Sequence, residues 1–90
     1  MKTVKVIHIH LQQEQTGEYV TLLQGMNQLY AQEILYIIQR HTQYSGKVMV
    51  HPTIGVYIRL LGNAMNVVKS EIEKRKLAST IKVHDHRVSF

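Results

Sequence analysis

Cysteine is absent from this chain of 90 residues, which excludes disulfides, thiolate metal sites and cysteine nucleophiles. Long hydrophobic runs are absent too, since no stretch approaches the ~20 apolar residues that span a bilayer. No small-residue cleavage site follows an apolar segment. The missing thiols fit a reducing compartment, and together these features favour a cytoplasmic location.

Aspartate occurs once, as Asp85, and the five glutamates are scattered. The chain also has no G-x-S-x-G, P-loop or H-E-x-x-H motif. A catalytic triad is a spatial arrangement, so the sequence leaves open whether the protein is an enzyme. It favours a binding or regulatory role over catalysis.

What the chain does contain is enough apolar sequence for a small core. Apolar residues make up 44% and charged residues 19%, which is typical of a globular chain. A chain of this length buries a little over ~60% of the surface that its unfolded form exposes. We therefore expect residues 1–90 to form a single domain.

The charge balance is basic, with a formal net charge of +5 when the histidines are neutral. Such a balance favours an anionic partner, nucleic acid before a phosphorylated ligand, although an ordinary soluble surface has the same composition. The tyrosines mostly fall within or beside predicted helices, so the stacking pattern of a single-strand binder is not seen. A basic cluster could line a phosphate backbone or simply complete a helix dipole: Lys69, Lys74, Arg75, Lys76 and Lys82.

The hydrophobic periodicity predicts a β-α-β-α-β order, and so a small α/β or α+β layer of three or four strands. Residues 3–11 alternate imperfectly as a strand, and apolar spacings of three and four predict a helix from Glu18 to about Gln43. Gly25 marks either a kink in this helix or a break between a short first piece and a main helix from about residue 27. A strand over 47–51 and a helix from Thr53 to about 76 follow. The apolar arc over 54–72 is wider than one sheet contact needs, which favours a homo-oligomer.

The last segment, residues 80–90, is strand-like with a break in its alternation. Ile81 and Val83 are apolar at odd positions, whereas Val88 and Phe90 are apolar at even ones. One regular strand would send these pairs to opposite faces. We therefore expect a hairpin turn or a bulge through residues 84–87.

An H-x-H pair lies near each end of the chain. On a strand, residues i and i+2 share a side and lie about 6.5–7 Å apart. If the first and last strands are neighbours, one divalent transition metal could be held by four imidazoles, with Asp85 as a further ligand or a supporting partner. Solvated or hydrogen-bonded histidines are the alternative. The four candidate ligands are His8, His10, His84 and His86.

The segment VMVHPTIG, residues 48–55, predicts a strand, a turn and a helix start. The first N–H groups of a helix lack internal partners and attract anions. An ordinary capped helix entry is the alternative, because this loop lacks repeated glycines. The candidate phosphate or carboxylate site consists of His51, Thr53, Ile54 and Gly55.

The segment LYAQEILYIIQRHTQYSGKVMV, residues 29–50, is similar in spacing to the active-site helix and following strand of the histidine-containing phosphocarrier (HPr) family. TIGVYIRLLG, residues 53–62, resembles the regulatory-serine helix of that family, with Thr53 at the serine position. The positions of the phosphorylated histidine and its arginine hold Tyr30 and Gln32, and the following proline is Glu33. The resemblance over 29–62 implies an HPr-like fold without phosphorelay activity.

Four functions therefore remain open. The first is a small basic binding or regulatory module with an anionic partner. The others are an HPr-like protein without phosphorelay activity, a metal-binding protein that uses the two H-x-H pairs, and an oligomeric scaffold.

Overall fold

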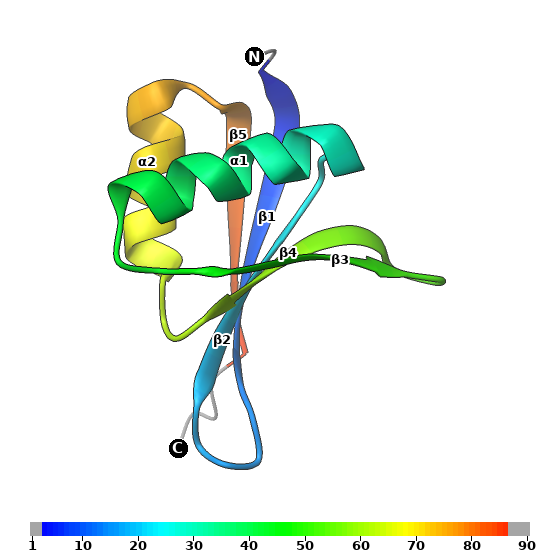
Figure 1. The fold of residues 1–90 in the computed structure, drawn as a ribbon, viewed down its shortest axis with the longest axis vertical. Helices are drawn as coiled ribbons and strands as arrows, with labels where there is room; N and C mark the ends of the chain where they lie inside the picture. The colour runs from blue at the N-terminus through cyan, green and yellow to red at the C-terminus, as the bar shows by residue number, and fades with distance from the viewer. Residues whose placement is uncertain (1–2, 87–90) are drawn as a thin grey trace.

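The structure, a computed structural model, describes residues 3–86 as a five-stranded sheet and two helices (Figure 1). The fold is α+β, as the sequence predicts, but with more strands than expected. The elements along the chain are β1 (Val4–Gln13), β2 (Tyr19–Gln24), α1 (Gln28–His41), β3 (Gly46–His51), β4 (Gly55–Leu61), α2 (Met65–Arg75) and β5 (Ala78–Asp85).

The strands lie in the order β3-β4-β2-β1-β5, so the first and last strands are neighbours. All the pairings are antiparallel except that of β1 with β5, which is parallel. A parallel pair needs a long connection, and here nearly the whole chain forms it. This pairing places the first and last strands side by side at one edge of the sheet.

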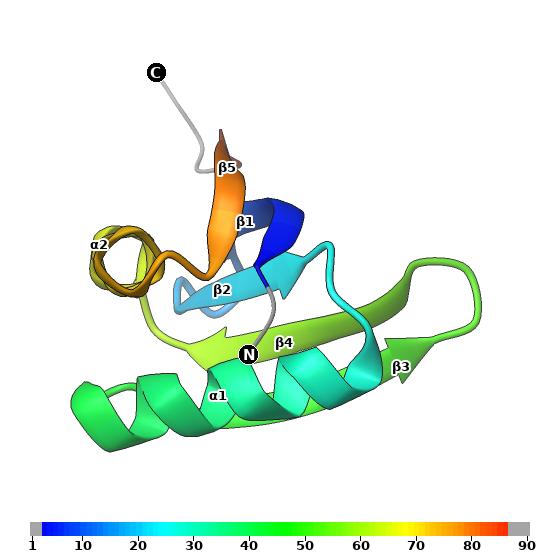
Figure 2. The same cartoon turned by 90° about the horizontal axis from the view of Figure 1, so that it is seen from above.

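The two helices cover one face of the sheet. α1 contacts β3 and β4, whereas α2 contacts β1 and β5 (Figure 2). The opposite face, which we call the open face, has no helix packed on it within residues 3–86. In neither helix is the apolar run long enough to cross a membrane, as far as residues 3–86 extend.

The alternation in β1 decides which side chains reach each face. Ile7, Ile9 and Leu11 are fully buried on the helix side. His8 and His10, between them in sequence, are half-buried on the open face. The apolar spacing that predicts strand β1 therefore also places its histidines.

α1 begins at Asn27, whose side-chain oxygen accepts a hydrogen bond from the backbone N–H of Tyr30 at 2.9 Å. Its buried residues, Ala31, Ile34 and Ile38, recur at spacings of three and four and form one stripe toward the sheet. The predicted helix therefore exists, and it starts at Gln28, as expected for a break at Gly25 rather than for one continuous helix from Glu18.

The segment 19–24, predicted as the first part of that helix, is strand β2. Thr21 and Leu23 are buried on the helix side, and Val20 and Leu22 alternate with them. A short apolar run fits both a helix and a two-sided strand, so its periodicity alone does not decide between them. Gly25, at φ +113°, ends the strand in a conformation that a helix does not use.

The predicted helix from Thr53 to 76 is also wrong in its first half. Residues 55–61 form strand β4, and α2 starts only at Met65. Gly62, at φ +95°, separates the two elements. The wide apolar arc over 54–72 is therefore divided between a strand and a helix, and the interface that we inferred from it loses its basis.

The C-terminal strand is regular as far as the structure describes it. β5 runs through His84 and Asp85, and the backbone N–H of His86 still donates to Leu11 O at 2.9 Å. The prediction of a turn or bulge over 84–87 is therefore wrong for residues 84–86, which continue the pairing with β1. Residues 87–90, including the apolar pair that suggested it, lie outside the described part of the chain.

Candidate metal centre

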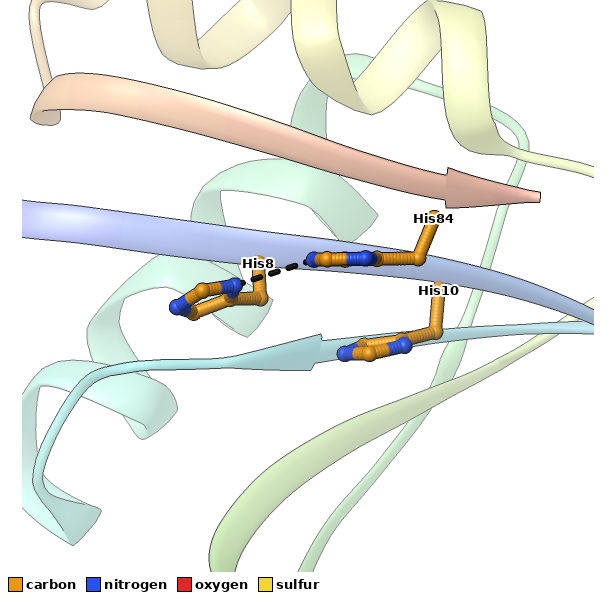
Figure 3. Close-up of side chains that lie close together, drawn as sticks. All are labelled: His8, His10 and His84. Carbon is orange, nitrogen blue, oxygen red and sulfur yellow. Dashed lines mark hydrogen bonds between the residues drawn. The ribbon is translucent and has the colours of Figure 1, made fainter.

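The two H-x-H pairs meet on the open face, at the paired strands β1 and β5. The parallel register places His10 opposite His84 and His8 opposite Lys82. All positions in this ladder have matching parity, so the even-numbered histidines of both strands point to the same side. Figure 3 shows His8, His10 and His84 standing together in front of the strands, with the helices behind.

The imidazoles form two close contacts across the strands. His8 Nδ1 lies 3.1 Å from His84 Nε2, and His10 Nδ1 lies 3.1 Å from His86 Nε2. The rings of His10 and His84 stack with centroids 4.4 Å apart and planes 12° apart. The four histidines therefore form one cluster, which we call the histidine cluster.

Three members of this cluster could hold a metal ion. One ligand nitrogen from each of His8, His10 and His84 lies within 4.8 Å of the others. With zinc–nitrogen bonds of 2.0–2.1 Å, two ligands of a tetrahedral ion lie about 3.3 Å apart. The 3.1 Å contact between His8 Nδ1 and His84 Nε2 matches that separation. His86 lies beside this group, with its Nε2 3.1 Å from His10 Nδ1.

The surroundings of His10 favour the neutral, metal-binding form of its imidazole. Burial lowers the pKa of His10 below its ordinary value of 6.5, and the neighbouring His84, His86 and His8 lower it further. A hydrogen bond with the Gln24 side chain acts in the opposite direction. At neutral pH His10 therefore offers a lone pair rather than a positive charge.

Asp85 does not take the ligand position that the sequence suggested. It lies between His84 and His86 in sequence and opposite Leu11 in the register. Leu11 faces the helix side and successive strand residues alternate, so Asp85 lies on the face away from the imidazoles. The ligands of the candidate centre are all nitrogens.

The predicted anion site at residues 51–55 has a different local structure. No helix begins there, because the segment is the turn between β3 and β4. The backbone N–H groups of Thr53 and Ile54 donate to His51 Nδ1 at 3.1 and 3.2 Å. The helix N-terminus on which that prediction depended is therefore replaced by a hairpin turn.

The predicted basic cluster is divided between two faces. Four of its members lie on or just after α2, where Arg75 pairs with Glu71 at 2.9 Å and Lys69 lies 4.0 Å from Glu73. Lys82 lies on β5 with the parity of His84, so it points to the open face. The sheet separates this lysine from the others.

Sequence reasoning missed the polar neighbour of the histidines on β2. Gln24 lies opposite His8 in the antiparallel register and interacts with His10. Its segment was interpreted as helical, so no signal placed it beside β1. The register of β2 against β1 is what shows that Gln24 is a neighbour of the histidines.

Comparison with protein-family models and with curated proteins gives no match. The resemblance to the HPr family therefore stays a prediction. The geometry of the open face is the basis for the functional conclusions below.

Proposed function

We propose that the protein binds one divalent transition-metal ion, zinc first, through His8, His10 and His84, with His86 as fourth ligand. The observation that carries this proposal is the convergence of three ligand nitrogens to within 4.8 Å of one another. These nitrogens come from two strands at opposite ends of the chain.

The donor set restricts the choice of metal. Imidazole suits zinc, copper, nickel and iron, whereas calcium and magnesium require oxygen ligands. The imidazoles of the cluster provide nitrogen donors only, and the one nearby carboxylate belongs to the other face. A donor set of imidazole nitrogens favours zinc, with nickel and copper as competitors.

Calorimetric titration of untagged protein with zinc chloride at pH 7.5 tests the proposal. We expect about one ion per chain, and the double variant His8→Gln, His84→Gln should lose at least tenfold in affinity. His41→Gln provides the matched control, because His41 is an exposed histidine at the end of α1.

The same titration at pH 5.5 should show much weaker binding, because protons compete for the imidazole nitrogens. Calcium should not bind in the same cell. Unchanged zinc affinity in the double variant would exclude the histidine cluster as the site, and no heat above the dilution control would exclude zinc binding itself.

A further inference from the structure

The cross-strand rows of side chains on the open face extend beyond the histidine cluster and across all five strands. A row is formed by the residues that lie opposite one another on β3, β4, β2, β1 and β5, in that order. One row consists of Lys47, Arg59, Leu22, His10 and His84. The adjacent row consists of Met49, Tyr57, Gln24, His8 and Lys82. Neither row contains a carboxylate.

The charges of these rows lie where a polyanion crossing the sheet would meet them. Lys47 is exposed on one edge strand and Lys82 is exposed on the other. Five strands about 4.8 Å apart set the two edges roughly 19 Å apart. Arg59, between them, is bonded to Glu14 at 2.7 Å, so the two lysines provide the uncompensated charge of the rows.

An aromatic ring lies between the two lysines. Tyr57 is half-buried and lines a groove of about 610 Å³ on the open face. Leu22, Val20, a run of glutamines and the ion pair of Arg59 with Glu14 line the same groove. An aromatic ring beside apolar side chains can stack a base, and glutamine amides can donate to and accept from base edges.

We propose that the open face binds single-stranded nucleic acid across its strands, with Lys47 and Lys82 on phosphates and Tyr57 under a base. A four-stranded RNA-binding sheet stacks two or three bases on several aromatic side chains of its face, and Tyr57 offers one such ring here. A folded duplex presents its bases edge-on inside its grooves, so it does not offer a base to Tyr57. The occupant is therefore a single strand.

Fluorescence anisotropy with a labelled 12-nucleotide oligouridine, in EDTA and 50 mM salt, tests this proposal without the metal centre. Lys47→Glu, Lys82→Glu should weaken binding at least tenfold and make it less dependent on salt, by about 0.7 in log–log slope for each phosphate that the variant no longer neutralises. Lys69→Glu, Lys74→Glu changes the net charge equally but on α2, and should leave the affinity within twofold.

Tyr57→Leu separates base stacking from simple attraction of anions, because leucine keeps the apolar packing without the ring. We expect a loss of about tenfold for the oligonucleotide and none for inorganic polyphosphate, which has no bases. Thermal unfolding of each variant confirms that it is folded at the assay temperature.

Three outcomes would overturn the proposal. The first is equal affinity for the Tyr57→Leu variant, and the second is preferential binding of duplex RNA. The third is a larger loss from the α2 variant than from the open-face variant, which would favour the helix end instead. Zinc titration is performed separately, so failure of this binding leaves the metal centre intact.

Discussion

Zinc should raise the melting temperature of the protein by a large and calculable amount, and His84→Gln should remove most of that increase. His8 and His84 are 76 residues apart and meet only when β5 pairs with β1. The unfolded chain retains separate H-x-H pairs with two nitrogens each, so it binds zinc more weakly than the complete cluster.

The size of the effect follows from mass action. When free zinc is 100 times its dissociation constant, binding to the folded state alone stabilises it by ~2.7 kcal/mol. For a domain of this size each kcal/mol raises the melting temperature by ~4–8 °C, so the expected increase is about 11–22 °C. Binding of zinc to the unfolded chain would reduce this value.

Differential scanning calorimetry of untagged protein with zinc, and again after addition of EDTA, measures the increase. His41→Gln should behave as wild type, because its histidine lies outside the cluster, whereas His84→Gln should retain only a few degrees. An equal increase in both variants would refute the reasoning, since zinc would then act at another site.

Three further perturbations test the fold around the site. The pKa of His10 in the folded protein lies below 6.5, so as the pH falls the unfolded chain binds more protons than the folded one does. The metal-free protein should therefore lose stability below about pH 6.5, which urea midpoints at several pH values would show. Thr21→Val removes a buried hydroxyl that accepts from the Ala64 N–H at 2.9 Å and donates to Gly62 O at 2.8 Å, which should cost about 2 kcal/mol in urea unfolding, whereas Thr21→Ser should cost less. Gly25→Ala places a Cβ against the backbone of β1 at a positive φ, so a loss of less than ~0.5 kcal/mol would contradict the structure.

The sequence predicts those elements whose pattern has a single interpretation. β1 alternates from Ile7 to Leu11, and the second half of the predicted first helix has a clear stripe at Ala31, Ile34 and Ile38. The ends of the chain also suggest the histidine centre, because H-x-H on a strand places two imidazoles on one side. What the pattern does not contain is the strand order, which decides whether the two pairs meet.

The missed strands share one physical cause. In β2 and β4 apolar residues point to both faces, because the open face also carries apolar side chains such as Leu22 and Leu61. The resulting runs have no clean period of two and match helical spacing by chance. Gly25 and Gly62 were the available signals, since each ends a strand with positive φ, but a glycine alone does not reveal its φ.

The position of the two H-x-H pairs at opposite ends of the chain gives the metal centre a specific relation to folding. β5 is an edge strand that pairs with β1 alone. Its pairing with β1 closes a loop that contains nearly the whole chain. Pairing over such a sequence distance costs more closure entropy than the hairpins β1–β2 and β3–β4 do. A shift of one residue in the register would turn His84 and His86 toward the helices. The metal centre would then have only the two ligands that β1 supplies, His8 and His10. An ion that requires three or four imidazoles therefore stabilises this register and no neighbouring one. In our proposal, zinc binding thus selects the correct docking of the last strand.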